Sequence, residues 1–246
     1  MFKGVGHTIL RYKCLKIIAP SSLLMPSEQS YCYIHPHPAV TTDVVLFTIR
    51  DGQLLLLLIR RGQPPFEGRW ALPGGFLEID EDPVSGAARE LAEETGVTGV
   101  ALEQFCTFGA VGRDPRERVI SIAHWALAEP RELQVAAGDD AAEARWFLLR
   151  GLPDLAFDHA EIIAAAHRHL SAGLVDARLA CRFLPPTFTL DELQRIYETL
   201  LDAEIDKRNL RTWSAALEQI EPTGEQRSRD GRPPARLYRG KTAVNA

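Results

Sequence analysis

This chain of 246 residues has only four cysteines, no long apolar run and no strong excess of one charge. Its four cysteines lie far apart without paired spacing, which argues against a zinc cluster and a disulfide framework. Short apolar runs broken by basic residues predict neither a signal peptide nor a membrane span. No phosphate-loop lysine motif and no internal repeat occur. We therefore expect a soluble globular protein of the reducing cytoplasm, without a membrane partner.

Charge is unevenly distributed along the chain. The formal net charge is −5, from 28 basic and 33 acidic residues. From Lys207 onward nine basic residues stand against four acidic ones, an excess of +5, so the preceding part carries −10. A basic end after an acidic body favours contact with a polyanion, and a solvated charged surface is the alternative.

Hydrophobic patterning predicts an α/β fold for the larger part of the chain. Aliphatic and β-branched runs at residues 40–49 and 54–59 flank Asp51 and Gly52, a dipeptide typical of a hairpin turn. Helices on both faces of a mixed sheet would form an α/β/α sandwich. Further strands are expected at residues 104–110, 119–128 and 143–149, and a helix at residues 158–170.

A change of pattern predicts a separate small domain over residues 173–246. Thr189 and Glu192 are spaced as a capping box at the start of one helix. Asp206 can cap a second helix, and residues 224–239 are typical of an arginine-rich hairpin. Before these two domains, the larger of which is placed at residues 39–172, residues 1–38 are expected to form a partly disordered extension, with translation starting at Met1 or Met25.

One helix is predicted over residues 83–95 by the residues at its ends. Asp82 is suited to the N-cap, Pro83 to the first helical position and Gly96 to the stop. Three glutamates lie on this helix three and four positions apart, so they should share a face. These are Glu90, Glu93 and Glu94.

The three glutamates predict a metal site. Carboxylates crowded on one face repel each other, and a hard divalent cation relieves that repulsion. Mg²⁺ prefers a few carboxylates with waters and phosphate oxygens, and Mn²⁺ is an alternative. Arg89 and Glu81 are interpreted as a supporting pair that orients a carboxylate. An ordinary acidic helix with solvated glutamates is the alternative reading.

Such a site is suited to hydrolysis of a nucleoside diphosphate linked to another group. A metal-bound water would attack one phosphorus while the cation neutralises charge on the bridging and leaving oxygens. Glu94 or Glu81 is the candidate general base, and the sequence does not decide between them.

This helix and its approach resemble the Nudix box at every defined position: Gly75, five residues, Glu81, seven residues, then Arg89 to Val97. The residues around the box resemble the ADP-ribose branch of Nudix proteins in particular. That resemblance is carried by Arg60–Gly62, Pro65–Phe66, Gly68–Pro73, Arg113–Arg116 and Leu155–His159.

The resemblance implies which residues meet the ligand. Arginines would contact the diphosphate and aromatic residues would hold the sugar or base, while glycines let the backbone pass close to the ligand. Trp70 is left open between a core residue and a ligand contact. The implied contacts are Arg60, Arg61, Phe66, Gly74, Gly75 and Arg113.

Four short motifs mark the carboxyl-terminal segment, namely Phe188–Leu190, Asp206–Asn209, Thr223–Glu225 and Leu237–Arg239. In these motifs the segment resembles the winged helix domain of Nudix-related transcriptional regulators of NAD biosynthesis, the NrtR family. The resemblance implies a winged helix-turn-helix whose second helix enters the major groove of an operator and whose wing contacts the backbone. The expected DNA-contacting residues are Lys207, Arg208, Arg211, Thr212, Arg227, Arg229 and Arg232. A solvated basic hairpin on a lid or dimerisation module is the alternative.

Two functions follow from this organisation. The first is a homodimeric transcriptional regulator of NAD metabolism genes, in which ADP-ribose or a related NAD metabolite changes DNA binding. The second is an ADP-ribose pyrophosphatase, yielding AMP and ribose 5-phosphate, with an accessory winged helix. Because the box is intact, hydrolysis is expected to persist in the regulator as well.

Overall fold

The computed structural model describes residues 35–129, 141–173, 177–206, 219–229 and 232–241. The chain divides into two compact units, Met1–Pro36 and His37–Ala246, and the elements below all belong to the second. Residues 1–34, and with them most of the expected extension, lie outside the described ranges. Of the helices within those ranges, none has the length and apolar character needed to cross a membrane.

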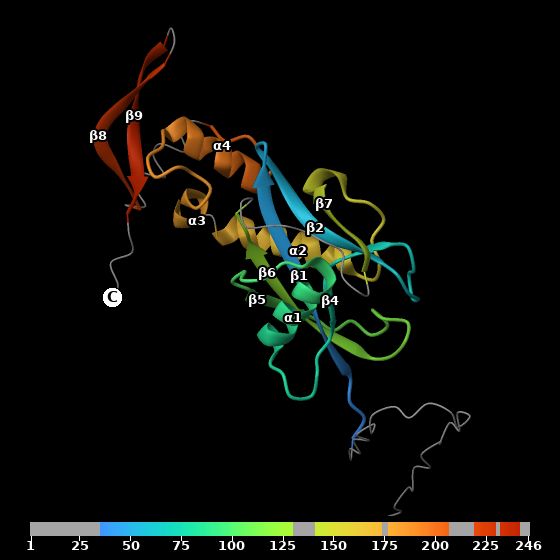
Figure 1. Ribbon diagram of the computed structural model, residues 1–246. Helices are drawn as coiled ribbons and strands as arrows, with labels where there is room; N and C mark the ends of the chain where they lie inside the picture. Colours follow the sequence, from blue (N-terminus) through green and yellow to red (C-terminus); the bar gives the residue numbers. More distant parts are fainter. Residues whose placement is uncertain (1–34, 130–140, 174–176, 207–218, 230–231, 242–246) are drawn as a thin grey trace, which may run out of the picture. The chain divides into compact units, whose positions relative to one another are not determined.

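Seven strands form one mixed sheet around the long strand β1 (Ala39–Arg50) (Figure 1). β1 is antiparallel to β2 (Gln53–Arg61) and parallel to β6 (Val119–Leu127). The predicted hairpin turn is confirmed: Arg50 pairs with Gln53 across a turn whose residues have φ of 51° and 71°. The remaining strands are β3 (Trp70–Ala71), β4 (Gly74–Phe76), β5 (Glu103–Phe108) and β7 (Ala141–Leu148).

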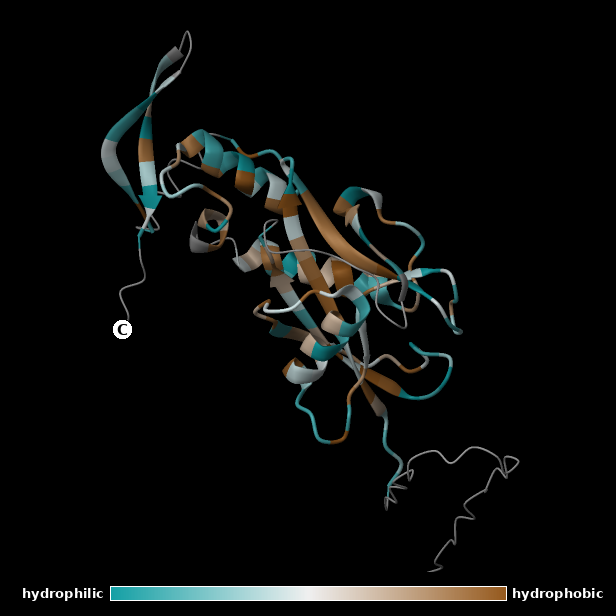
Figure 2. Ribbon diagram, viewed as in Figure 1, coloured by the Kyte–Doolittle hydropathy of each residue, from teal (hydrophilic) through white to brown (hydrophobic). Residues whose placement is uncertain are grey.

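The sheet is covered by one helix on each face. Side chains alternate along β1, so Val44 and Leu46 pack against α1 (Pro83–Thr95), whereas Val45 and Phe47 pack against α2 (His159–Gly173). Figure 2 shows the resulting apolar colour of β1 and β2. The predicted α/β/α sandwich with a mixed sheet is confirmed.

The ends of α1 follow the local chemistry of the sequence. The Asp82 carboxylate accepts hydrogen bonds from the Val84 and Ser85 backbone N–H groups, at 3.0 and 3.1 Å. Gly96 adopts the left-handed conformation, with φ of 72°, and its N–H donates to Ala92 O. These two residues fix where the glutamate-bearing helix begins and ends.

Beyond a short 3₁₀ turn at Leu149–Gly151, the carboxyl-terminal part contains α3 (Ala177–Cys181), α4 (Leu190–Leu201), β8 (Ile220–Arg229) and β9 (Arg232–Gly240). Phe188 and Tyr238 exchange two backbone hydrogen bonds, of 2.9 and 2.7 Å, which join the start of α4 to the hairpin. The helix predicted to begin at Asp206 falls on residues 207–218, outside the described ranges. Strands β3 and β4 and helix α3 were not predicted, because each is too short for a periodic pattern.

We expect the Thr189→Ala substitution to lower the free energy of unfolding by about 1 kcal/mol, because both bonds of the capping box are present. Glu192 N donates to Thr189 Oγ1 at 3.2 Å, and Thr189 N donates to Glu192 Oε2 at 2.7 Å. Urea denaturation measures the change, with exposed Thr98→Ala as the matched control. Equal stability of the two variants would contradict this account of α4.

Candidate functional site

Arg89 organises the charges of helix α1. Its guanidinium binds Glu81 bidentately, with Nε and Nη2 donating at 3.0 and 2.6 Å. Its Nη1 donates to Glu90 at 2.9 Å and to Glu93 at 3.1 Å. Hydrogen bonding to Arg89 lowers the pKa of the Glu81 carboxyl, and the pKa of Arg89 is raised in turn. The predicted supporting pair is therefore in contact, and the same arginine also holds two of the three expected metal ligands.

The three glutamates differ in their surroundings. Glu94 is 9% exposed, and its Oε2 accepts the Gly74 N–H at 2.8 Å. Glu90 is largely buried, whereas the Glu93 side chain is 58% exposed. Burial raises the pKa of Glu94 to about 8 against the opposing bond from Gly74, and burial also raises the pKa of Glu90. We call Glu90 and Glu94, which both line the cavity described below, the acidic pair.

The two glycines of β4 lie very close to neighbouring atoms, which are backbone atoms of β1 at Gly74 and the Glu90 carboxylate at Gly75. A Cβ on Gly74, whose φ is 150°, would lie 2.1 Å from Thr42 O. A Cβ on Gly75 would lie 2.3 Å from Glu90 Oε1. The backbone of β4 thus runs directly against β1 on one side and against the acidic pair on the other, as expected of residues that allow close backbone approach.

The acidic pair has the chemistry of a Mg²⁺ site, although its ligands are not gathered. Within the described ranges, no three His, Cys, Asp or Glu side chains are grouped so that they could hold one ion. Arg89 instead draws Glu90 and Glu93 to itself. Two desolvated carboxylates with raised pKa values nonetheless form an all-oxygen donor set whose ionised form a divalent cation would stabilise. The chemistry of these two carboxylates therefore fits such an ion.

A cavity of about 400 Å³ opens beside the acidic pair. Arg61 and Arg116, which we call the basic pair, line it together with Phe157. Both guanidinium groups lie over the Phe157 ring, at 4.9 and 5.9 Å from its centroid. Burial lowers the pKa of Arg61, and the positive charge of Arg116 lowers it further. Two cations that repel each other across an open space form a site for an anion.

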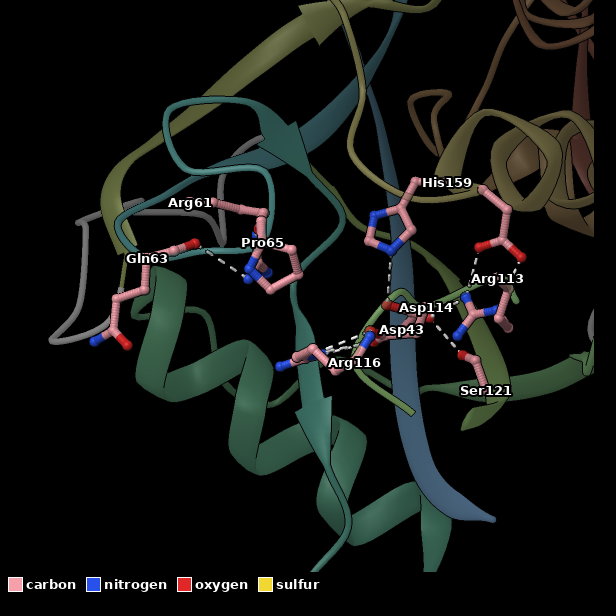
Figure 3. Close-up of polar contacts among 10 residues, drawn as sticks. Asp43, Arg61, Gln63, Pro65, Arg113, Asp114, Arg116, Ser121 and His159 are labelled. Carbon is pink, nitrogen blue, oxygen red and sulfur yellow. Dashed lines mark hydrogen bonds and ion pairs between the residues drawn. The ribbon is translucent and has the colours of Figure 1, made fainter. Parts of the chain in front are cut away.

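Neighbouring groups hold the basic pair in place (Figure 3). Arg61 Nε donates to Pro65 O at 2.7 Å. Arg116 forms a bidentate pair with Asp114, with Nε and Nη2 donating at distances between 2.7 and 3.3 Å. Asp114 neutralises much of the Arg116 charge, whereas no carboxylate among the described side chains forms an ion pair with Arg61. Arg61 is therefore the stronger cation of the two toward a bound anion.

Buried polar side chains, some of which line the cavity, form a network that we call the buried network (Figure 3). Arg113 donates twice to Asp158, at 2.8 and 2.6 Å, and its Nη2 lies 3.5 Å from Asp43. Ser121 donates a short hydrogen bond to Asp43, and His159 Nε2 lies 3.4 Å from the same carboxylate. Hydrogen bonding to Asp158 raises the pKa of Arg113 against the effect of its burial. Two carboxylates therefore already neutralise Arg113.

The expected ligand contacts are only partly brought together. Arg61, Gly74, Gly75 and Arg113 line the cavity. Arg60 does not line it in the described part of the chain, because alternation along β2 turns its side chain toward Gly68 O, at 3.1 Å.

The aromatic residues are similarly divided. Phe66 packs edge-on against Phe157, with centroids 4.8 Å apart, so it supports the ring that lines the cavity. Trp70, left open above, packs against Phe147 beside the core. Phe157 and His159, which line the cavity, belong to a segment that the sequence singled out without assigning these residues a role.

Most of the expected DNA-contacting residues lie outside the described ranges, namely Lys207, Arg208, Arg211 and Thr212. Arg229, the last residue of β8, pairs in the register with Arg232, the first residue of β9. Arg227 is held within its own domain: Nη1 donates to Glu192 at 2.8 Å and Nη2 to Thr187 O at 3.1 Å. The Arg227 charge is thus partly neutralised.

Comparison with known proteins gives matches for both parts of the chain. Residues 37–166 match the NUDIX domain family, and residues 180–239 match the NrtR DNA-binding winged helix domain. The ADPR responsive transcriptional repressor NtrR of Acinetobacter baylyi is 34% identical over 209 residues, 83% of each protein. The ADP-ribose pyrophosphatase of Methanocaldococcus jannaschii is 42% identical over 130 residues, which are 53% of this chain and 73% of that protein.

Two solved structures from Shewanella oneidensis are similar as well. NrtR complexed with a 27mer DNA has 36% identity and a TM-score of 0.64, over 82% of this chain and 93% of that one. The NUDIX domain of the same protein complexed with ADP ribose has 36% identity and a TM-score of 0.51, over 55% of this chain and 90% of that one.

We expect Glu94→Gln to change how stability depends on pH. With a pKa of about 8 in the folded chain and an ordinary value of 4.5, Glu94 retains a proton in the folded state that it loses on unfolding between these pH values. The wild-type free energy of unfolding should therefore fall as pH rises from about 4.5 to about 8. The glutamine variant lacks this proton but keeps an oxygen for Gly74.

Between pH 5 and pH 8, the free energy of unfolding of the variant should rise by roughly 2 kcal/mol relative to that of wild type. Urea denaturation in EDTA buffer at several pH values measures the difference. Exposed Glu67→Gln is the control and should follow the wild-type profile. Parallel profiles for Glu94→Gln and wild type would show that the carboxyl is ionised throughout.

Proposed function

The chain belongs to the NrtR family of Nudix-related transcriptional regulators, and from this membership we propose that it is an ADP-ribose-responsive DNA-binding regulator of NAD metabolism genes. The winged helix domain would bind a double-stranded operator, and ADP-ribose or a related NAD metabolite would bind in the cavity. A ligand with different affinities for the DNA-bound and free forms shifts the balance between them. We propose a cytoplasmic homodimer that reads paired half-sites.

The observation that carries this proposal is the charge pattern of the cavity. It presents the acidic pair and the basic pair in one space of about 400 Å³, together with the Phe157 ring. A diphosphate can satisfy both pairs at once, by accepting hydrogen bonds from arginines and by sharing a cation with carboxylates. The aromatic ring adds a surface for a sugar or base. We also propose that residues 39–172 form the Nudix domain and residues 173–246 the winged helix domain.

We propose that the domain also retains Nudix hydrolase activity with Mg²⁺, or Mn²⁺ in its place. When bound by Glu90, Glu93 and Glu94, the ion would neutralise charge on the diphosphate and lower the pKa of a water molecule. Of the two candidate bases, Glu94 is favoured because Arg89 already occupies both oxygens of Glu81. The Gly74 N–H orients the Glu94 carboxylate toward the cavity.

An ADP-ribose pyrophosphatase with an accessory winged helix is the second candidate. Its support is the 42% identity to the Methanocaldococcus jannaschii enzyme, which covers 53% of the chain. Similarity to the Acinetobacter baylyi repressor instead spans both domains. The regulator is therefore the function that accounts for the whole chain, with hydrolysis as an accompanying activity.

Removing the basic pair with Arg61→Ala and Arg116→Ala should weaken ADP-ribose binding at least about tenfold, because charge-assisted hydrogen bonds are lost. Operator binding should be unchanged. Adjacent Arg60→Ala is the matched control and should behave as wild type. Fluorescence anisotropy with DNA from upstream of the neighbouring NAD metabolism genes, titrated with ADP-ribose, measures both affinities.

Arg208→Ala with Arg211→Ala should give the reverse result, namely lost operator binding with intact ADP-ribose binding. If this variant binds the operator as wild type does, the predicted recognition helix is wrong. If saturating ADP-ribose leaves wild-type DNA binding unchanged, the chain is not a regulator of the proposed kind.

Glu93→Gln with Glu94→Gln should reduce Mg²⁺-dependent release of AMP from ADP-ribose at least about 100-fold, because the base and two proposed ion ligands are altered. DNA binding should stay at the wild-type level. EDTA should abolish the wild-type activity and added Mg²⁺ restore it, as followed by chromatography of the nucleotide products. Wild type without any Mg²⁺-dependent AMP release would be a sensor that does not hydrolyse its ligand.

A further inference from the structure

His159, the first residue of α2, joins two separate parts of the cavity. Its side chain is 6% exposed, and it lines the cavity between the Phe157 ring and Asp43. Leu72 N donates to its Nδ1 at 2.9 Å, and its Nε2 lies 3.4 Å from Asp43 Oδ1. The same imidazole therefore contacts both Leu72, which lies just before β4, and Asp43, which lies at the centre of the buried network.

These two contacts identify the tautomer of the ring. The Leu72 N–H needs an acceptor, so Nδ1 carries no proton. Burial lowers the pKa of His159, which favours the neutral ring. A neutral imidazole has one proton, and it must then lie on Nε2, facing the Asp43 carboxylate.

On its Leu72 side, His159 extends a backbone ladder. Trp70 pairs with Leu155 in a parallel bridge, and Ala156 N donates to Trp70 O at 2.8 Å. The chain then turns at Phe157, whose φ is 51°, so the backbone leaves the ladder. The imidazole supplies the acceptor that the next backbone carbonyl would otherwise have provided for Leu72.

The segment that His159 holds leads directly to the acidic pair. Val44 N donates to Pro73 O at 2.8 Å, and Gly74 N donates to Glu94 at 2.8 Å. Leu72, Pro73 and Gly74 thus each take part in a hydrogen bond, and His159 provides the acceptor for the first. Release of Leu72 would loosen the strand on which the position of the Glu94 carboxylate depends.

We propose that His159 is a positioning residue of the cavity: its Nδ1 accepts the Leu72 N–H and so fixes the Leu72–Gly75 segment, with Glu94, while Asp43 keeps the ring in this tautomer. This role rests on the proposed function where it concerns ADP-ribose. The hydrogen bond to the Leu72 amide does not depend on which ligand binds. Protection of this amide and affinity for ADP-ribose can therefore be measured separately.

Two substitutions test the contacts of Nδ1 and Nε2 separately. In His159→Asn the amide oxygen stands near the place of Nδ1, so Leu72 keeps an acceptor while the contact with Asp43 is lost. In His159→Gln the amide nitrogen reaches the place of Nε2, so Asp43 keeps a donor while Leu72 loses its acceptor. His169→Gln, on the same helix but with a side chain 40% exposed, is the matched control.

Hydrogen exchange of the Leu72 amide, followed by NMR, and the Kd for ADP-ribose, measured calorimetrically, are the two readouts. His159→Gln should accelerate Leu72 exchange and weaken ADP-ribose binding, each at least about tenfold. His159→Asn should stay within about threefold of wild type in both, because Asp43 retains Ser121 and Arg113. His169→Gln should change neither.

Equal effects of the asparagine and glutamine variants, or wild-type exchange and affinity in His159→Gln, would overturn the proposal. If Leu72 exchange behaves as expected but wild type does not bind ADP-ribose, the ligand assignment fails and the positioning role stands. Should His159→Gln not fold, Asp43→Asn and Asp43→Ala replace it. Asp43→Asn keeps an acceptor for His159 Nε2 and should preserve the protection of the Leu72 amide from exchange. Asp43→Ala removes this acceptor and should reduce that protection. Equal protection in the two variants would overturn the proposal.

Discussion

The close approach of the β4 backbone to its neighbours is the constraint on which the site depends. Gly74 lies against Thr42 O and Gly75 lies against the Glu90 carboxylate, at distances that leave no room for a Cβ. At Gly74 the neighbouring backbone leaves no room for a side chain, and at Gly75 a side chain would have to displace the Glu90 carboxylate. The same approach puts the Gly74 N–H within reach of Glu94, so a backbone restriction becomes the means of orienting a carboxylate.

Around β4, the carboxylates and the guanidinium groups differ in how far neighbouring groups of opposite charge neutralise them. Arg89 binds Glu81 and lowers the pKa of that carboxyl, whereas Glu94 is buried with a single backbone donor and takes a raised pKa. Arg113 is neutralised by Asp158 and Asp43, while Arg61 lacks such close compensation in the described residues and faces the cavity. A ligand that carries two negative charges therefore meets groups whose own charges have not been fully compensated.

Local signals predicted much of the fold. The turn at Asp51 and Gly52 and the helix limits at Asp82 and Gly96 are confirmed, because each depends on a few adjacent residues with a specific backbone preference. The box also predicted the contact between Arg89 and Glu81. These features need no knowledge of distant parts of the chain.

Features that depend on long-range packing could not be predicted in the same way. Arg60 and Arg61 are chemically equivalent in sequence, and only the orientation of β2 turns one of them into the cavity. Asp43 and His159 meet across the sheet, 116 positions apart, without a motif that links them. Glu90 and Glu93 share Arg89 Nη1, as their helical spacing allows, whereas the burial of Glu94 and its bond from Gly74 depend on β4, which helical spacing does not predict.

The contact of Arg227 with Glu192 and Thr187 has a consequence for the thermodynamics of operator binding. A free arginine that meets a phosphate displaces a condensed counterion from DNA, which is the origin of the salt dependence of such complexes. A guanidinium that must first leave a carboxylate gains little from that exchange. The number of ions released on binding should accordingly be smaller than the number of arginines in the hairpin.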